Sequence, residues 1–425
     1  MLSVQSGQAW YFKEFRPAFS DFFLPAMVLG LLLTRSQAHP TDSRDGSLLP
    51  VLIVMFAVLF LTLGNTVAFM ELRTIPQWTW LNKDIGLLDL LLSFFAILHL
   101  ADTREKLQST VKIFVLSGSI INFAALLGGI AWYVFGIPNV MMREESSLRL
   151  TGLMVNPNAY GGFVFCVFFL QAALLIGNSG LLPLSRNLQR LNLVFLGMAA
   201  MMTLSRSALL GFAAGTMALL FFHRVKAGLR LAAVGCVCLT GLTAVLYWYS
   251  DSSRTSAQFW GVELSDRTIL ERIDINRVAV NMLVGGPPIK VITGIGVGTF
   301  LSRSETYLGM PLIIHNDFLW LLVETGLWGF LLFTCILGRG LLNCVAVVRM
   351  RVAESPIAVG VACALVGTVG WMLGTEGLWH RHVWFLLALS ESYHRLCVRA
   401  PATSSLEKLR LQKAWAPVAF ARRCF

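Results

Sequence analysis

Residues 315–326 read HNDFLWLLVETG, a histidine and two polar residues followed by an apolar, helix-like run. This run ends a polar interval that begins near Asp251, whereas almost everything before and after the interval is apolar. A cluster of charges in an otherwise apolar chain indicates that the segment meets a polar or charged molecule, so we expect it to form the active site. Its six basic residues are Arg254, Arg267, Arg272, Arg277, Lys290 and Arg303.

The composition predicts a polytopic integral membrane protein. The chain has 425 residues, of which 56% are hydrophobic and 13% charged, whereas a soluble globular chain carries roughly 25% charged residues. The net charge of +11 does not indicate nucleic acid, because the basic residues lie in short loops and in the C-terminal tail rather than on one amphipathic face. No cleavable signal peptide is evident in residues 1–20, so we expect insertion to depend on the first spanning helix.

Apolar segments long enough to cross a bilayer recur along the chain, since a span needs about 20 apolar residues. We expect eleven, near residues 19–34, 48–70, 85–101, 111–135, 159–178, 191–205, 206–222, 230–249, 316–338, 355–374 and 378–396. The economical architecture is one integral domain in four parts. These are an N-terminal transmembrane bundle (1–249), a large loop outside the cytoplasm (250–311), C-terminal transmembrane helices (312–397) and a basic cytoplasmic tail (398–425).

The orientation follows from lysine and arginine in the short loops, which mark the cytoplasmic side. Basic residues at 223–230, at 339–351 and in the tail predict that these segments are cytoplasmic. Alternation then places 136–158, the turn at Arg206, the long loop and 375–381 on the opposite side. Eleven spans with a cytoplasmic C-terminus place the N-terminus outside, so either a further short helix before residue 110 makes twelve spans or the N-terminus is external.

We expect neither a metal nor a cofactor. The eight cysteines lie in apolar runs or in the tail, with no zinc-ligand spacing, and free cysteine behaves as a small hydrophobe. No Asp-x-Asp pair lies in a polar segment, which disfavours a metal-dependent nucleotide-sugar transferase. The sequence GIGVGT at 294–299 lacks the third glycine of a dinucleotide fingerprint and the lysine of a P-loop. We therefore expect its glycines to make tight turns that fold the loop over a cavity.

His315 is the first candidate for catalysis. On a continuous helix, eleven steps of about 100° bring Gly326 to within about 20° of His315, and nine steps place Glu324 on the opposite face. His315 would then stand at the aqueous end of a packed surface, where an imidazole can accept a proton. The alternative is a histidine that only satisfies the start of a helix, with Asn316 or Asp317 as its partner.

Arginines are the second set of candidates. Arg206 stands in SRSALLG (205–211), where two apolar runs meet with hardly any polar loop. A charge there is costly unless it faces a cavity or an anion, although an arginine that snorkels to the interface is the alternative. Arg149 precedes MVNPN (154–158), a turn signal that opens the next span on the same expected side.

The arginines of the long loop recur at five-residue intervals, at Arg267, Arg272 and Arg277. On a helix that spacing spirals rather than aligns, so we expect one or two of them to reach inward. Guanidinium groups bind diphosphate oxygens bidentately, and several converging at the outer leaflet would suit a lipid diphosphate.

Taken in order, these motifs resemble the O-antigen ligase and O-antigen polymerase superfamily of bacterial membrane glycosyltransferases. The resemblance covers roughly residues 140–340 and rests on five motifs. They are His315 with Gly326, Arg206 with Leu210, GIGVGTF at 294–300, Arg149 before Asn156-Pro157-Asn158, and ETGLWG at 324–329. It implies an all-α, C-type glycosyltransferase-like fold in the bacterial inner membrane, in which residues 250–311 form a large periplasmic loop and the active site faces the periplasm. The family usually has twelve spans with both ends cytoplasmic.

The implied reaction transfers a glycan from an undecaprenyl diphosphate carrier to a sugar hydroxyl. His315 would accept the proton of the acceptor hydroxyl. Arg206, Arg149 and one loop arginine (Arg272 or Arg277) would stabilise the departing diphosphate without a metal. A single displacement predicts inversion at the anomeric carbon. The residues expected to bind substrate are Arg149, Asn156, Asn158, Arg267, Gly296 and Asn316.

Three functions remain after the sequence is considered. In a ligase, which we favour, the acceptor is the lipid A-core; in a polymerase it is another lipid-linked repeat unit. A transporter of lipid-linked glycan is the third, but no inverted repeat of the kind typical of transporters is visible. The expected partners are the lipid-linked donor, the acceptor and membrane lipids, with no nucleic acid.

Overall fold

The structure is a computed structural model that describes residues 90–144, 148–154, 156–223, 267–309, 312–350, 352 and 355–399. The expected spans 19–34, 48–70 and 230–249 lie outside these residues, as do the first part of the long loop and nearly all of the tail. The chain divides into two compact units, which we describe separately. Of the described residues, unit 1 contains those within 90–99, 267–338 and 378–388, and unit 2 contains those within 100–223, 339–377 and 389–399.

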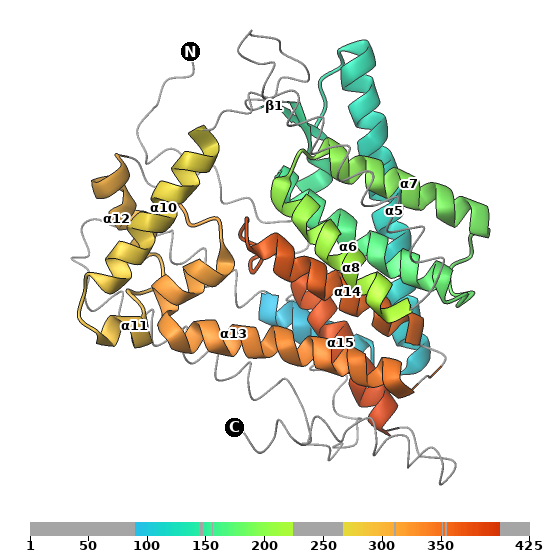
Figure 1. Cartoon of the computed structure of the whole chain (residues 1–425). Coiled ribbons are helices and arrows are strands. Elements are labelled where there is room, and N and C mark those ends of the chain that lie inside the picture. The colour runs from blue at the N-terminus through green and yellow to red at the C-terminus, as the bar shows by residue number, and fades with distance from the viewer. Residues whose placement is uncertain are drawn as a thin grey trace. The chain divides into compact units, whose positions relative to one another are not determined.

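The described part of the chain is mostly helical, as Figure 1 shows. A helix at Leu90–Leu100 is followed by α5 (Arg104–Phe135), β1 (Met142–Glu144), β2 (Leu148–Leu150), η2 (Gly152–Met154), α6 (Pro157–Ile176), α7 (Arg186–Met202), α8 (Arg206–His223), α10 (Arg267–Val284), α11 (Ile289–Thr293), α12 (Thr299–Leu308), α13 (Asp317–Met350), α14 (Ser355–Met372) and α15 (Arg381–Arg399).

Four of these helices, α5, α6, α13 and α14, are long and apolar enough to cross a membrane. The helix α8 is apolar but shorter. The remaining expected spans at 191–205 and 378–396 do form helices, but α7 has 17 residues and α15 carries Arg381, Glu391 and Arg395 within its length. The protein is a multi-pass membrane protein built mainly from helices.

A short hairpin accompanies the helices, and the mostly helical structure agrees with the expected all-α class. Strands β1 and β2 pair antiparallel between α5 and α6, with Met142 opposite Leu150 and Arg143 opposite Arg149. Met142 and Leu150 are buried on one face of the pair, whereas successive residues of a strand point to opposite faces. The hairpin therefore fixes the direction in which Arg149 leaves the backbone, which helical periodicity could not predict.

The core of unit 2 is built from α6, α8 and α14, which lie side by side in Figure 1. Helices α6 and α8 run parallel, because Gly161 lies against Ala208 and Phe169 lies against Gly215. Helix α14 runs antiparallel to α8, with Gly367 opposite Gly211: a Cβ at Gly211 would lie 2.8 Å from the Gly367 carbonyl oxygen. Small residues permit this close approach of membrane helices. The N-termini of α6 and α8 consequently lie at the same end as the C-terminus of α14.

Two further helices complete unit 2. Helix α5 runs antiparallel to α6, since the Tyr160 hydroxyl donates to Asn122 Oδ1 at 3.1 Å while Gly118 lies against Val167. Helix α7 is joined to α5 by a hydrogen bond from Asn192 Nδ2 to Ser119 Oγ at 2.7 Å. The C-terminal end of α5 and the hairpin therefore lie at the end of the unit where α6 and α8 begin.

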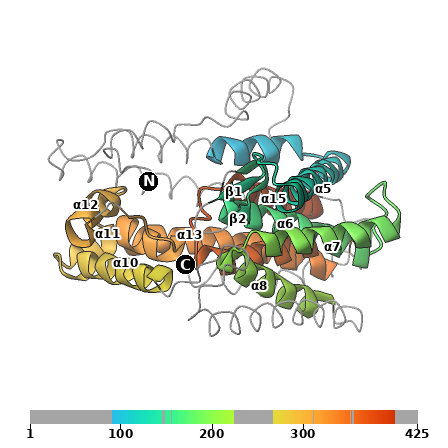
Figure 2. The ribbon, with the colours of Figure 1, turned by 90° about the horizontal axis from the view of Figure 1, so that it is seen from above.

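Unit 1 contains α10, α11 and α12, which gather beside one another in Figure 2, and the first part of α13. Helix α10 buries Ile275, Ala279 and Leu283 along one face. Helix α13 starts where the sequence predicts a span, near 316, but continues to Met350 instead of ending at 338. It is interrupted at Gly326, whose φ of 70° and ψ of −170° are not helical.

Candidate functional site

Arg149 of β2 contacts the ends of two helices in unit 2. Its Nε donates to the Thr203 carbonyl oxygen at 2.9 Å, and one terminal nitrogen donates to Asn158 Oδ1 at 3.1 Å. Thr203 ends α7 and Asn158 lies in the first turn of α6. The half-buried guanidinium therefore joins the hairpin to two helix ends.

The start of α6 supports this contact. Asn156 is the N-cap: its Oδ1 accepts from the N–H of Asn158 at 2.8 Å and of Ala159 at 3.4 Å. Pro157 follows at the first helical position, where proline is favoured because it lacks the N–H that would be unsatisfied there. Trp371 of α14 donates its indole N–H to the Asn158 carbonyl at 3.1 Å. The structure thus places Asn156 as a helix cap and Asn158 as the partner that orients Arg149.

Arg206 is the first residue of α8 and has an exposed side chain. It follows a tight turn in which Leu204 has a φ of 50°, a conformation uncommon for a residue other than glycine. Ser205 Oγ then accepts the N–H of Ala208 at 3.2 Å and so caps the helix. Arg206 lies three residues beyond Thr203, the residue whose carbonyl Arg149 binds.

The arrangement in unit 2 suits an anion. The N-terminal turns of α6 and α8 lie side by side, and helix N-termini carry partial positive charge and N–H groups that favour anions. Arg149 and Arg206 add two guanidinium groups at the same end, and these bind phosphate oxygens in a planar, bidentate geometry. The structure therefore brings Arg149, Asn156, Asn158 and Arg206 to one end of the unit.

His315 lies in unit 1, directly before α13, and is half-buried. Asn316 is the helix cap, because its Oδ1 accepts from the N–H of Phe318 at 3.0 Å and of Leu319 at 3.1 Å. The expectation that His315 and Gly326 share one face of a continuous helix is wrong. His315 precedes the helix, which begins at Asp317, and Gly326 departs from helical geometry.

Gly326 has a different role, which is to let another chain segment approach. A Cβ there would lie 2.2 Å from the Ile292 carbonyl oxygen, and a Cβ at Gly294 would lie 2.2 Å from the Glu324 carbonyl oxygen. Gly294, Gly296 and Gly298 all have positive φ, which confirms the expected tight turns. The N–H of Gly296 donates to the Glu324 carbonyl at 3.0 Å. The glycine loop therefore packs on α13 at the interruption.

The loop arginines occupy different environments on α10. Arg272 is half-buried and lies on the same side as the buried residues Ile275 and Ala279, three and seven positions further along. Arg277 is exposed and pairs with Asp274 one turn earlier, at 3.9 Å. Arg267 is the first residue of the helix. Of the two arginines that the sequence leaves open, Arg272 is the one on the packed face.

A turn at 378–380 also lies at the start of α13. The N–H of Leu378 donates to Asp317 Oδ2 at 2.8 Å, and the rings of Trp320 and Trp379 meet edge to face at 5.4 Å. The imidazole of His380 follows, and burial lowers the pKa of His380 to about 4. Within the described residues, no group of three His, Cys, Asp or Glu side chains is arranged to hold a metal ion.

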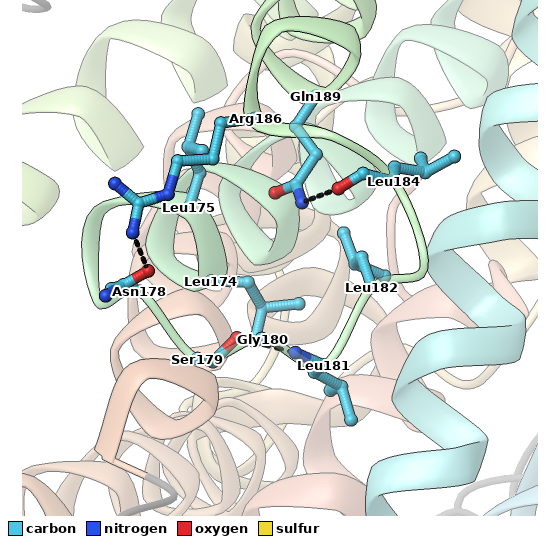
Figure 3. Close-up of a pocket in the computed structure, with 10 residues that line it drawn as sticks. All are labelled: Leu174, Leu175, Asn178, Ser179, Gly180, Leu181, Leu182, Leu184, Arg186 and Gln189. Atoms are coloured by element: carbon cyan, nitrogen blue, oxygen red, sulfur yellow. Dashed lines mark hydrogen bonds between the residues drawn. The ribbon is translucent and has the colours of Figure 1, made fainter.

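A small pocket lies elsewhere in unit 2, where α6 ends and α7 begins (Figure 3). Its volume is about 110 Å³. Arg186 donates to Asn178 Oδ1, and Gln189 Nε2 donates to the Leu184 carbonyl at 2.8 Å (Figure 3). Because it surrounds the C-terminal end of α6, it lies away from Arg149 and Arg206, and its lining contains none of the expected site residues.

Three groups that contact the candidate segments were not among the residues that the sequence predicted for the site. Thr203 acts through its main-chain carbonyl, so no side-chain pattern could have indicated it. Ser304 of α12 is buried and bonded to Leu312, but an isolated serine carries no signal. Glu324 does carry a signal in the sequence, because an acidic residue inside an apolar run is costly and requires a partner. Its carboxylate accepts the backbone N–H groups of Gly298 and Phe300.

Residues 191–334 match a family model described as O-antigen ligase. The matched region contains Arg206, Arg272, His315 and Gly326, while Arg149 precedes it. No curated protein matches the chain. The family implies a glycosyltransferase-like activity of the ligase or polymerase type on lipid-linked glycans. The match over residues 191–334 therefore supports the resemblance of this chain to the O-antigen ligase and polymerase superfamily.

Proposed function

We propose that the protein is an O-antigen ligase of the bacterial inner membrane. It transfers a glycan from undecaprenyl diphosphate to a sugar hydroxyl of the lipid A-core at the periplasmic face. The observation that carries this proposal is the Arg149 group, in which Arg149, Asn158 and Thr203 are hydrogen-bonded beside the starts of α6 and α8. The family match makes a lipid-linked glycan the relevant substrate class.

The Arg149 group and Arg206 receive the diphosphate of the donor. As the bond between the anomeric carbon and the diphosphate breaks, negative charge grows on the departing oxygens. Donors that are already oriented stabilise this charge without reorganising during the reaction. Asn158 and the Thr203 carbonyl hold the Arg149 guanidinium in place, so Arg149 is pre-oriented, while the exposed Arg206 is free to move toward the carrier.

His315 accepts the proton of the acceptor hydroxyl as the hydroxyl attacks the anomeric carbon. A general base that acts in this way contributes typically 10²- to 10⁴-fold to the rate. Arg272, on the packed face of α10, is the loop arginine that we assign to the diphosphate. One displacement without a protein nucleophile gives inversion at the anomeric carbon.

Purified protein, lipid-linked donor and core acceptor in detergent test this proposal. We expect wild-type protein and the control His99→Ala to attach glycan to the core, and His315→Ala to lose at least a hundredfold in rate while remaining folded in the membrane. Undiminished attachment by His315→Ala would overturn the base assignment. Loss of activity on adding a chelator would overturn a mechanism that uses arginines alone.

The polymerase alternative is separated from the ligase by the glycan that accumulates. A strain without this gene leaves long chains on the lipid carrier if the protein is a ligase. It leaves single repeats attached to the core if the protein is a polymerase. Gel analysis of the lipopolysaccharide, with complementation by wild-type and His315→Ala genes, distinguishes these outcomes.

A further inference from the structure

Glu324 is a buried acid within the apolar helix α13, with a relative exposure of 1%. Its Oε2 accepts the N–H of Gly298 at 2.7 Å and its Oε1 accepts the N–H of Phe300 at 3.2 Å. These N–H groups belong to the start of α12, whose N-cap, Gly298, has no side chain to cap the helix. Glu324 supplies the missing cap from another helix, and a carboxylate is the favoured charge at a helix N-terminus.

The backbone next to Glu324 reinforces the same contact. In an uninterrupted helix, the carbonyls of Val323 and Glu324 accept from residues 327 and 328. At the interruption of α13, they accept instead from the N–H groups of Ile295 at 2.9 Å and Gly296 at 3.0 Å. The glycine loop and the first turn of α12 are thus fixed to α13 by four hydrogen bonds.

Ser304 ties α12 to the segment that carries His315. The serine is fully buried. Its Oγ accepts the N–H of Leu312 at 2.9 Å. The hydroxyl can donate to the carbonyl oxygen of Leu301, at 2.9 Å, or of Leu312, at 3.1 Å. Leu312 precedes His315 by three residues, and Ile314 between them is also fully buried.

These contacts close a ring that begins and ends at His315. From His315 the chain enters α13 through the Asn316 cap and reaches Glu324, which binds the start of α12. Ser304 of α12 then binds Leu312, which leads back to His315. We call this ring the His315 frame: residues 312–325, α12, and the contacts of Glu324 and Ser304.

We propose that Glu324 and Ser304 are positioning residues that set where the His315 imidazole stands during glycan transfer. This inference rests on the proposed role of His315 as the base. Neither residue needs to touch substrate, because each acts through the backbone on either side of the histidine. A misplacement of about 1 Å in a catalytic group can reduce a rate by about a hundredfold, so loosening the frame should slow the chemical step more than it weakens binding.

The variants Glu324→Gln and Ser304→Ala test the frame. Glu324→Gln keeps the size of the side chain but removes its charge and one acceptor, while Ser304→Ala removes only the hydroxyl. Glu305→Gln and Thr306→Ala are matched controls, because both side chains are exposed on α12. We expect both frame variants to lower kcat by about tenfold to a hundredfold with donor and acceptor KM within twofold, and the controls to match wild type.

Hydrogen exchange gives a second reading that does not depend on activity. We expect the backbone amides of residues 312–316 to exchange faster in Ser304→Ala and Glu324→Gln than in the two controls. If Glu324→Gln is not recovered from membranes, Ser304→Ala carries the test, since it removes a single hydroxyl. Faster exchange with unchanged kcat would overturn the positioning role.

A double variant separates positioning of His315 from a general effect on the fold. In single-turnover reactions, we expect Ser304→Ala to leave the residual rate of His315→Ala unchanged, because it acts through the histidine. A rate of the double variant below the residual rate of His315→Ala would overturn the inference. Full activity of His315→Ala alone would instead refute the proposed function, so the two failures are distinguishable.

Discussion

Two of the three arginines of α10, Arg272 and Arg277, illustrate how little a residue type says about its role. Arg272 is on the packed face of the helix, whereas Arg277 is exposed and paired with Asp274. We expect Arg272→Ala to lower kcat/KM for the lipid-linked donor by about tenfold to a hundredfold, since removing one donor to a developing charge has an effect of that order or larger. Arg277→Ala should change it by less than about twofold, because exposed ion pairs contribute little. Transfer assays on both purified variants check this, and the reverse order of effects would refute the assignment of Arg272.

The lowered pKa of His380 predicts that the stability of the protein depends on pH. Burial lowers the pKa of His380 to about 4, whereas an unperturbed histidine has a pKa near 6.5. The unfolded chain therefore binds the proton first, so the stability present above about pH 6.5 is lost as the pH falls toward 4. We expect His380→Gln to lose less thermal stability than wild type between pH 7 and pH 5.

Thermal unfolding in detergent at the two pH values measures this effect. His99→Gln is the control, because His99 is exposed. A pH dependence of the Tm in His380→Gln equal to that of wild type would contradict the role given to His380.

At the scale of the element, the interruption of α13 is the feature that shapes unit 1. With φ of 70° and ψ of −170°, Gly326 occupies a region that is essentially confined to glycine and that costs other residues on the order of 1–3 kcal/mol. The Ile292 carbonyl oxygen would also lie 2.2 Å from an added Cβ. A substitution here must therefore move either the helix or the glycine loop.

We expect Gly326→Ala to destabilise the protein by about 2 kcal/mol or more and to abolish most transferase activity, since the glycine loop can no longer seat on α13. Gly338 is the matched control, because it lies on the same helix with open space around it. Gly338→Ala should be neutral or stabilise the helix by up to about 1 kcal/mol. Unfolding curves and transfer assays on both variants check this, and equal stability of the two would refute a special role for Gly326.

At the scale of the whole molecule, the polarity of the helices predicts which ends of unit 2 share a side of the membrane. The hairpin and the starts of α6 and α8 lie at one end, and the connection between α6 and α7 lies at the other. We expect a cysteine at Leu153 to react with a membrane-impermeant maleimide in cells with a permeabilised outer membrane. A cysteine at Ser179 should react only after the inner membrane is opened.

Both positions are exposed, so a difference in labelling reports the side of the membrane rather than burial. The parent for this comparison should carry serine at Cys335, which is also exposed. Labelling of Ser179→Cys alone in sealed inner membranes would reverse the orientation and place the Arg149 group in the cytoplasm. The boundaries predicted at 250, 312 and 398 remain predictions.

The sequence by itself determined the class of the protein and most of its helices. Long apolar runs form helices in a bilayer, because no water is present and the backbone N–H and C=O groups must hydrogen-bond to one another. The expected spans at 111–135, 159–178 and 355–374 accordingly correspond to α5, α6 and α14. The motifs around Arg206 and His315 also indicated the resemblance to the O-antigen ligase family. They stand out because a charged substrate requires polar groups in a chain that is otherwise apolar.

Only the tertiary structure decided how those polar groups are held. The contact of Arg149 with Thr203 spans 54 residues of sequence, and that of Glu324 with Gly298 spans 26. Helical periodicity is a local property, and it predicted that His315 and Gly326 share one face of a helix. The helix in fact begins after His315 and is interrupted at Gly326. The break exists because a distant loop must approach the backbone of α13 closely, and contacts between distant segments leave no periodic signal in the chain.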